Sequence, residues 1–246
     1  GVPYIYETLN KIGLKKLKID TIDYLTQAGG KLNLDLNKKI VTFAKKNKLK
    51  FFSMYGQTEA SPRIAILDHK YSLKKIGSIG KSIAGGKIWL ENANGKKINK
   101  ANTIGELIYY GKNVSNGYAY NKYDLNINQK NNFILKTGDL AYFDKEKFLY
   151  VSGRVNRLAK VFGIRFNLEE LEERLSNNGY ITVCVCINNV IYLCSEKNYS
   201  VKKLFQSSAN ITMLNSQVFR YIKLKKFPRN LSGKIQIKKI LENINV

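Results

Sequence analysis

Four short segments place glycine beside charged or hydroxyl side chains that could carry out chemistry. They are Tyr55-Gly56-Gln57-Thr58-Glu59-Ala60, Thr137-Gly138-Asp139-Leu140, Gly153-Arg154-Val155-Asn156-Arg157 and Ser232-Gly233-Lys234-Ile235. Taken singly, each segment is also typical of a surface turn, because glycine and short polar residues favour turns. A functional interpretation therefore depends on their combination.

The histidine and cysteine content narrows the possible chemistry. His69 is the only histidine, so Ser-His-Asp or Cys-His catalysis would have to use it, and no cluster with metal-ligand spacing surrounds it. The cysteines Cys184, Cys186 and Cys194 share one apolar stretch without the spacing of a disulfide framework, which fits a reducing cytosol. Cys184 and Cys186 alternate along a predicted strand, so we expect them to pack on one face as small hydrophobic residues.

In this order and at these separations, the four segments resemble the adenylate-forming superfamily of acyl-CoA synthetases, peptide-synthetase adenylation domains and luciferases. The resemblance covers nearly the whole chain. It also includes Gly29-Gly30, Gly77 to Gly80, Gly105-Glu106-Leu107 through Gly117-Tyr118, and Lys160 through Arg165. It implies an AMP-forming ligase that uses ATP to activate a carboxylic acid as an acyl-adenylate.

The resemblance implies that the first segment binds ATP and Mg²⁺. Tyr55 matches the adenine-facing aromatic residue of the family, and the adjacent Gly56 lets the backbone approach a ligand closely. Gln57 lies in the same turn, and Thr58 offers a hydroxyl to phosphate oxygens. Glu59 offers Mg²⁺ a hard oxygen ligand, the alternative being a surface carboxylate at the start of a helix.

The resemblance assigns further nucleotide-binding residues in the other segments. Asp139 corresponds to the ribose-binding aspartate, whose carboxylate can accept hydrogen bonds from two neighbouring hydroxyls; its alternative role is to form the tight glycine turn itself. Arg154 and Arg165 would bring permanent positive charge to the nucleotide and its phosphates. Gly29 and Gly30 match the rim of the acyl site.

Lys234 matches the lysine that this superfamily carries in a loop near the carboxy terminus. Adenylation brings a carboxylate to the α-phosphorus and expels pyrophosphate, so two anions must be held together. A flexible ammonium supplied by a mobile domain can stabilise that transition state. The lead-in Pro228-Arg229-Asn230-Leu231-Ser232-Gly233 favours this role over one more lysine in a lysine-rich tail.

The elements that position the first segment are predicted to be a helix and a strand. Residues 33–46 have a possible cap at Asn33 and an apolar stripe at helical spacing. Residues 50–54 predict a buried strand that leads into Tyr55. This order is typical of α/β architecture, where ligands lie beyond the carboxyl ends of strands.

From about residue 76 the pattern changes to short strands and turns. Strands are predicted at 87–91 and 105–110, with turns at Asn94-Gly95 and Asp144-Lys145. We therefore assign residues 1–155 to the carboxy-terminal part of the large AMP-binding domain, with an α/β segment over 1–75 and a β-rich subdomain over 76–155.

Residues 156–246 are predicted to form a small, mobile α+β domain that carries the lysine loop. Asn167 followed by Glu170 is a capping-box variant, and a hairpin is predicted around Asn188-Asn189. Another helix, a strand near 219–224 and a basic tail follow. The fold class is thus α/β plus α+β, with Asn156 as the hinge between the two domains.

The composition contains 42 Lys and Arg against 18 Asp and Glu, which gives a net charge of +24. Nucleic-acid binders gather basic residues on one element between aromatic platforms, whereas here the lysines are scattered. We therefore expect no nucleic-acid partner. No apolar run reaches the length of roughly 20 residues that spans a bilayer, so no integral membrane segment is expected. The cysteine usage favours a cytoplasmic location.

The segment Gly80-Lys81-Ser82 ends like a Walker A loop, but Lys75 stands where the first glycine is required. We interpret it as a connecting turn. The superfamily's own Gly/Ser/Thr-rich phosphate loop is absent, so the isolated chain is expected to be an incomplete enzyme. Asn156 replaces the usual Asp or Lys of the hinge, and Lys31-Leu32 follow the glycine pair in place of a small residue and proline.

Three functions remain open on the sequence alone. The leading hypothesis is a ligase that transfers the acyl group of a small carboxylic acid to the thiol of CoA, with a carrier-protein thiol as the alternative acceptor. The second is a non-catalytic remnant that binds nucleotide or acts as a scaffold. The third, a basic nucleic-acid binder, predicts an affinity that falls steeply with salt.

Overall fold

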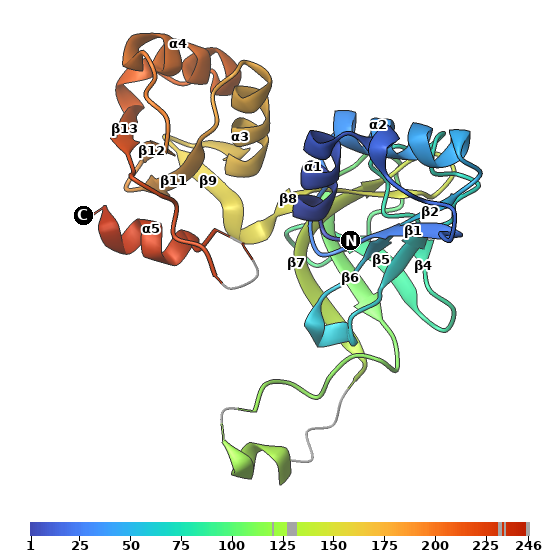
Figure 1. Cartoon of the computed structure of the whole chain (residues 1–246). Helices are drawn as coiled ribbons and strands as arrows, with labels where there is room; N and C mark the ends of the chain where they lie inside the picture. The colour runs from blue at the N-terminus through green and yellow to red at the C-terminus, as the bar shows by residue number, and fades with distance from the viewer. Residues whose placement is uncertain (120, 127–131, 231–232, 234, 245–246) are drawn as a thin grey trace. The chain divides into compact units, whose positions relative to one another are not determined.

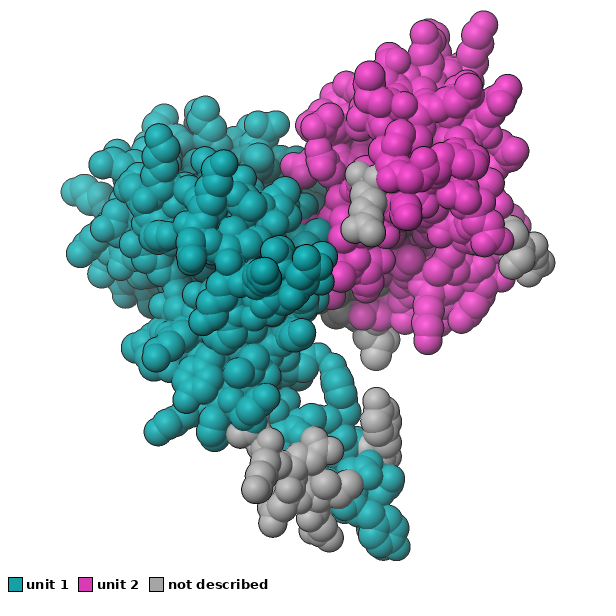
Figure 2. Space-filling model, turned by 180° about the vertical axis from the view of Figure 1, so that it is seen from behind, with its two compact units in different colours: residues 1–152 teal, residues 153–246 magenta. Residues whose placement is uncertain are grey.

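The computed structural model describes residues 1–119, 121–126, 132–230, 233 and 235–244. It divides into two compact units, residues 1–152 and 153–246, which Figure 2 shows in different colours. The domain boundary predicted from the sequence follows residue 155. No helix among the described residues is long and apolar enough to cross a membrane.

The first unit begins with a four-stranded sheet and two α-helices (Figure 1). Its elements are α1 (Pro3–Ile12), η1 (Leu14–Lys16), β1 (Tyr24–Gln27), α2 (Leu34–Lys46), β2 (Lys50–Tyr55), η2 (Thr58–Ala60), β3 (Ala65–Leu67) and β4 (Lys81–Ser82). The strand order is β1-β2-β3-β4, with β1 and β2 parallel and the other pairs antiparallel. Helix α2 connects the two parallel strands and packs on β2 with α1 beside it.

The predicted helix and strand are confirmed. The Asn33 side chain caps α2 by accepting hydrogen bonds from the N–H groups of Asp35 and Leu36, at 3.0 and 3.2 Å. Ile40 on its apolar face and Phe51 on β2 are almost fully buried in one core. This packing fixes β2, and with it the position of Tyr55 at its end.

The interpretation of Gly80-Lys81-Ser82 as a connecting turn is wrong, because Lys81 and Ser82 form β4 against β3. Gly80 permits this pairing. A Cβ atom at Gly80 would lie 2.0 Å from the carbonyl oxygen of Ile66, so only glycine allows the two backbones to approach.

The second sheet of the first unit is the predicted β-rich region. Its strands are β5 (Lys87–Glu91), β6 (Gly105–Tyr110), β7 (Ile134–Phe143) and β8 (Leu149–Arg154), in the order β5-β6-β7-β8, with η3 (Lys122–Asn126) between β6 and β7. β5 and β6 have the predicted bounds. The Asn94-Gly95 turn is also confirmed, since Gly95 has a φ of +74° and donates to the carbonyl of Asn92 at 2.9 Å.

The second unit is a small α+β fold. Its elements are η4 (Val155–Arg157), β9 (Leu158–Val161), β10 (Ile164–Asn167), α3 (Leu168–Asn177), β11 (Val183–Ile187), β12 (Val190–Ser195), α4 (Val201–Thr212), η5 (Ser216–Val218), β13 (Phe219–Lys223) and α5 (Ile237–Asn243). β9 and β10 form an antiparallel hairpin, and β11-β12-β13 form a mixed sheet. Asn188 and Asn189 both have positive φ, as the predicted hairpin turn requires.

Two cores lie on opposite faces of the mixed sheet. Cys184 packs with α3 and α4 on one face, whereas Val183 packs with Ile240 of α5 on the other. The three cysteines are free, and Cys184 and Cys186 share a face as predicted. The end of the chain is more than a basic tail, because α5 buries Ile240 completely.

Candidate nucleotide site

Two of the predicted site residues meet in the first unit, although 84 positions separate them in the sequence. Tyr55 ends β2 and Asp139 lies in β7. The Tyr55 hydroxyl donates a hydrogen bond to the Asp139 carboxylate at 2.5 Å. Asp139 is 4% exposed, and this contact helps to satisfy a carboxylate that burial would otherwise penalise.

The backbone around Asp139 is a bulge within a strand, and the predicted tight turn is therefore wrong. Pairing between β6 and β7 passes from Glu106↔Leu140 to Ile108↔Lys136, so residues 137–139 oppose Leu107 alone. Gly138 takes a φ of +70° in this bulge, and the Thr137 hydroxyl donates to the Leu107 carbonyl at 2.8 Å. Bulges re-aim side chains, and this one directs Asp139 toward Tyr55.

Gly56 is required by the chain's own packing. A Cβ atom there would lie 1.7 Å from the carbonyl oxygen of Pro62. The predicted reason for this glycine was the close approach of a ligand, whereas the close neighbour in the structure is the loop that returns toward β3. Gly56 thus holds the turn after Tyr55 in a compact form.

Gln57, Thr58 and Glu59 continue from Tyr55 into the one-turn helix η2. Gln57 and Glu59 are half-buried and Thr58 is exposed. The Tyr118 hydroxyl donates to the Glu59 carboxylate, and the Ser115 N–H donates to the Glu59 carbonyl at 2.8 Å. Tyr118 was not predicted as a partner of Glu59, since this contact joins two loops that are distant in sequence.

The residues between η2 and β3 are held by Asn113, which was also not predicted. Its side-chain amide donates to the carbonyls of Ala60 and Arg63, at 2.5 and 2.8 Å. Its side-chain oxygen accepts a hydrogen bond from the buried Tyr109 hydroxyl at 2.7 Å. The turn is therefore braced by β6 and the loop after it.

Gly29 and Gly30 follow the carboxyl end of β1, and Tyr55 ends the neighbouring parallel strand β2. Gly29 has a φ of +79°, and the Gly30 carbonyl accepts a hydrogen bond from the Gln27 side chain at 2.7 Å. Because the carboxyl ends of parallel strands share one edge, the glycine pair and the Tyr55 turn lie on the same side of the sheet.

The remaining predicted residues belong to the second unit, which begins within β8 at Gly153. Arg154 ends β8 and Asn156 lies in η4, both with exposed side chains. Arg165 is in β10, but its side chain lies outside the described part of the chain. Lys234 also lies outside the described residues, whereas its neighbour Gly233 is described and has a φ of +81°.

A buried ion pair beside Asn156 was not predicted. The Arg157 guanidinium donates to the Glu172 carboxylate and, at 2.9 Å, to the Cys184 carbonyl. The same carboxylate accepts from the Cys184 N–H at 2.6 Å. The pair therefore ties η4 to α3 and β11. Its signal in the sequence was the position of Glu172, four residues after Leu168 on the apolar face of α3.

Burial raises the pKa of the Glu172 carboxyl from 4.5 to about 7, against the opposing charge of Arg157. The folded state then binds this proton more tightly than the unfolded state. We expect the stabilisation by this group to be complete below pH 4.5 and lost as the pH rises through about 7. The total effect is at most roughly 3–4 kcal/mol, at about 1.4 kcal/mol per pKa unit.

Urea unfolding of the chain between pH 5 and 7 measures this dependence. Glu172→Gln should flatten the pH profile, whereas Glu173→Gln, at the exposed neighbouring position, should leave it unchanged. An unchanged slope in Glu172→Gln would assign the pH dependence to other groups.

Within the described ranges, no group of three or more His, Cys, Asp or Glu side chains could hold a metal ion. Glu59 is therefore not part of such a cluster among these residues. A Mg²⁺ ion that it binds would need its other ligands from phosphate oxygens and water, which is the usual arrangement for this ion.

Comparison with known proteins finds similarity to AMP-binding enzymes and to CoA ligases. The family model for AMP-binding enzymes matches residues 1–119. The chain is 34% identical over 138 residues to the 2-succinylbenzoate–CoA ligase of Oceanobacillus iheyensis, a match that covers 56% of this chain and 28% of the relative. The resemblance to the adenylate-forming superfamily is thereby confirmed.

Solved structures extend the similarity to both units. The O-succinylbenzoate coenzyme A synthetase of Bacillus subtilis in complex with AMP matches with a TM-score of 0.71 and 26% identity, over 96% of this chain and 48% of that chain. The same synthetase has been solved with ATP and a magnesium ion, and it matches at a TM-score of 0.70, 26% identity, and 96% and 49% coverage. The chain thus spans about half the length of these relatives, and the predicted fold class is confirmed.

Proposed function

We propose that this chain is the carboxy-terminal part of an AMP-forming acid–CoA ligase, which activates a carboxylic acid as an acyl-adenylate and transfers the acyl group to CoA. The observation that carries the proposal is the contact between Tyr55 and Asp139. It joins the two segments assigned to adenine and ribose, in the unit that contains the matched AMP-binding region. The relatives named 2-succinylbenzoate–CoA ligase support both half-reactions.

The residues present fit ATP. In the proposed site, Tyr55 faces the adenine and the Asp139 carboxylate accepts hydrogen bonds from the ribose hydroxyls. Thr58 and Gln57 line the turn toward the phosphates. The compact backbone at Gly56 keeps these groups together, since the turn closes on Pro62.

Glu59 is the proposed ligand of Mg²⁺, which would neutralise charge on the phosphates. Its carboxylate is half-buried and already oriented by the Tyr118 hydroxyl. Gly29 and Gly30 would form the rim of the acyl site, beyond the end of β1. The acid itself is proposed to be a small carboxylate.

The second unit is proposed as the small mobile domain of the ligase, with Asn156 as its hinge and residues 1–155 as part of the large domain. Arg154 and Arg165 would bring positive charge to the nucleotide, and Lys234 would stabilise the adenylation transition state. The Arg157–Glu172 pair supports this hinge, because it anchors the residue that directly follows Asn156.

CoA is the proposed thiol acceptor, and a carrier protein is the second candidate. The chain is also 26% identical over 207 residues to bacitracin synthase 2 of Bacillus licheniformis, across 78% of this chain and 8% of that protein. The named CoA ligases favour CoA. The proposed location of the enzyme is the cytoplasm. We propose no nucleic-acid partner, because the lysines are dispersed over many elements.

The test is ATP–pyrophosphate exchange in a complete enzyme, made by joining this chain to the amino-terminal part of the Bacillus subtilis synthetase that it lacks. We expect exchange that depends on an added carboxylic acid and on Mg²⁺, measured against a panel of aromatic and aliphatic acids. Release of AMP with thioester formation should then require CoA. An enzyme that binds AMP but exchanges no pyrophosphate with any acid would favour the non-catalytic remnant.

A further inference from the structure

The connection between β2 and β3 carries Glu59 in a strained turn. The Tyr55 carbonyl accepts a hydrogen bond from the Ile64 N–H at 2.9 Å, so residues 56–63 form this connection. Ser61, which follows η2, takes a left-handed φ of +47°. This conformation costs energy for a residue other than glycine, so neighbouring groups must hold the turn in place.

Asn113 is a group that holds this turn. Its side-chain amide donates to the carbonyls of Ala60 and Arg63, at 2.5 and 2.8 Å. An asparagine amide has two donor hydrogens, so both are used on the same turn. The two carbonyls lie before and after Ser61 in the sequence. One side chain from a distant segment therefore ties the two sides of the strained residue together.

The orientation of the Asn113 amide is set by Tyr109. The Tyr109 hydroxyl donates to the Asn113 side-chain oxygen at 2.7 Å, and Tyr109 is completely buried. Two glycines leave room for this bond. A Cβ atom at Gly111 would lie 2.3 Å from the Tyr109 hydroxyl oxygen, and one at Gly86 would lie 2.7 Å from it. The bond therefore occupies a space that side chains at these two positions would close.

The anchor of the turn lies in the second sheet of the first unit. Tyr109 belongs to β6, and it shares a buried core with Ala60. The loop after β6 also contacts Glu59 directly, because the Ser115 N–H donates to the Glu59 carbonyl at 2.8 Å. The position of Glu59 is therefore fixed relative to β6 at two points, through the amide of Asn113 and through the backbone of Ser115.

We propose that Asn113 is a positioning residue of the Mg²⁺ site: by holding two carbonyls of the turn, it fixes where Glu59 presents its carboxylate. The inference rests on the proposed function, in which Glu59 binds Mg²⁺. Loss of a residue that orients a metal ligand typically lowers metal affinity by about 10- to 100-fold. Adenine and ribose recognition should be unaffected, because Tyr55 is held by its pairing with Ala65 and Asp139 by the bulge in β7.

Mn²⁺ tests the proposal, because carboxylate and phosphate oxygens bind it as they bind Mg²⁺ and electron paramagnetic resonance detects it. In the joined enzyme of the exchange assay, Asn113→Ala should weaken the binding of Mn²⁺ in the presence of ATP about tenfold. The affinity for AMP without metal, measured by calorimetry, should stay near that of the unsubstituted enzyme. Equal losses of Mn²⁺ and AMP affinity would indicate a purely structural role and overturn the proposal.

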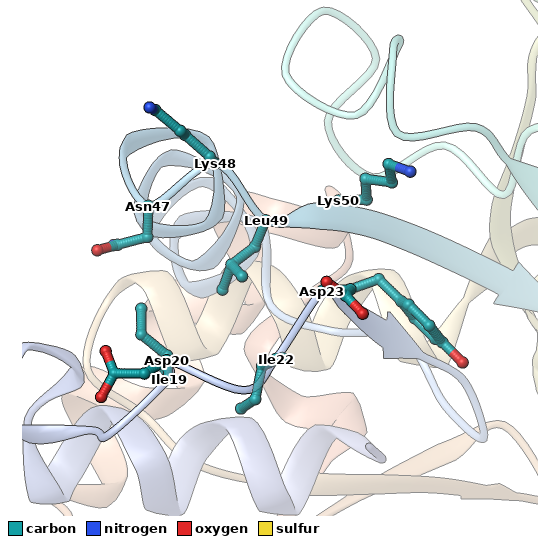
Figure 3. A pocket seen from close by; sticks show the side chains of 9 residues that line it. Ile19, Asp20, Ile22, Asp23, Asn47, Lys48, Leu49 and Lys50 are labelled. Carbon is teal, nitrogen blue, oxygen red and sulfur yellow. The ribbon is translucent and has the colours of Figure 1, made fainter.

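Asn47→Ala is the matched control. Asn47 precedes β2, whereas Tyr55 ends it, and it borders a pocket of about 620 Å³ between the segments that lead into β1 and β2 (Figure 3). Its side-chain amide donates to the Phe43 carbonyl at 2.8 Å, so this substitution also removes an asparagine hydrogen bond to the backbone. Both affinities should remain unchanged, which separates the turn at Glu59 from the loss of any such bond.

Tyr109→Phe covers the case in which Asn113→Ala folds poorly. It keeps the buried ring and removes only the hydroxyl that orients the amide, so Mn²⁺ binding should weaken while AMP binding does not. Unchanged Mn²⁺ affinity in the variants that fold, together with a loss in Glu59→Gln, would overturn this inference alone. Unchanged Mn²⁺ affinity in Glu59→Gln would refute the metal role of Glu59 in the proposed function, and this inference with it.

Discussion

Substitution of Asp139 by alanine is expected to weaken the binding of AMP and ATP by about ten- to a hundredfold. Each hydrogen bond to a charged acceptor contributes roughly 1.5–3 kcal/mol, and about 1.4 kcal/mol corresponds to a factor of ten in affinity. The carboxylate is 4% exposed and held by the Tyr55 hydroxyl, so its position is set before the ribose arrives. Calorimetric titration of the chain with AMP measures the loss.

The matched controls separate ribose recognition from damage to the site. Free adenine lacks the ribose, so Asp139→Ala should leave its weak binding unchanged. Tyr55→Phe keeps both the ring and the carboxylate and removes only the hydroxyl, so its effect on AMP affinity should be smaller. Equal losses for adenine and AMP would indicate a structural role for Asp139, and undiminished AMP affinity would refute the ribose assignment.

Local patterns in the sequence predicted the elements that depend on local physics. The cap at Asn33, the turn at Asn94-Gly95 and the hairpin at Asn188-Asn189 each follow from side chains and backbone angles within a few residues. The strands 87–91 and 105–110 were predicted with their observed bounds. These segments needed no information about distant neighbours.

Features that depend on distant contacts could not be predicted in the same way. The bulge at Gly138 exists because residues 137–139 oppose Leu107, and the short strand at Lys81 exists because Gly80 fits against β3. Either glycine alone suggests a turn, and the pairing partner decides the outcome. The Arg157–Glu172 pair likewise joins η4 to α3, and no helical or strand spacing relates residues in two different elements.

The same distinction between local patterns and distant contacts applies to the candidate site. The assignment of Tyr55 and Asp139 to one site came from the resemblance to a family, and their contact is a property of the fold that no spacing rule gives. Gly56 was assigned to the site because glycine lets the backbone approach a ligand closely. In the structure, the close neighbour of Gly56 is the carbonyl oxygen of Pro62. Lys234 lies outside the described residues, so its role stays a prediction from the sequence.

Lys234→Ala is expected to reduce acyl-adenylate formation by about 10²–10³ in the joined enzyme. Removal of one preorganised electrostatic group that acts on the transition state typically costs this much in rate. The lysine is proposed to hold the carboxylate and the α-phosphate together while charge moves to the leaving pyrophosphate. Thioester formation from a supplied acyl-adenylate no longer needs that contact, so this half-reaction should be affected much less.

Two assays on one variant test the assignment: pyrophosphate exchange, and thiol transfer from a supplied adenylate. Lys239→Ala is the matched control, because it removes an exposed lysine of α5 a few residues away and should leave both rates near normal. A selective loss of exchange in Lys234→Ala would identify this lysine as the adenylation residue and the second unit as a catalytic domain. Equal losses in both assays, or undiminished exchange, would deprive Lys234 of that role and favour a chain that binds nucleotide without catalysing the reaction.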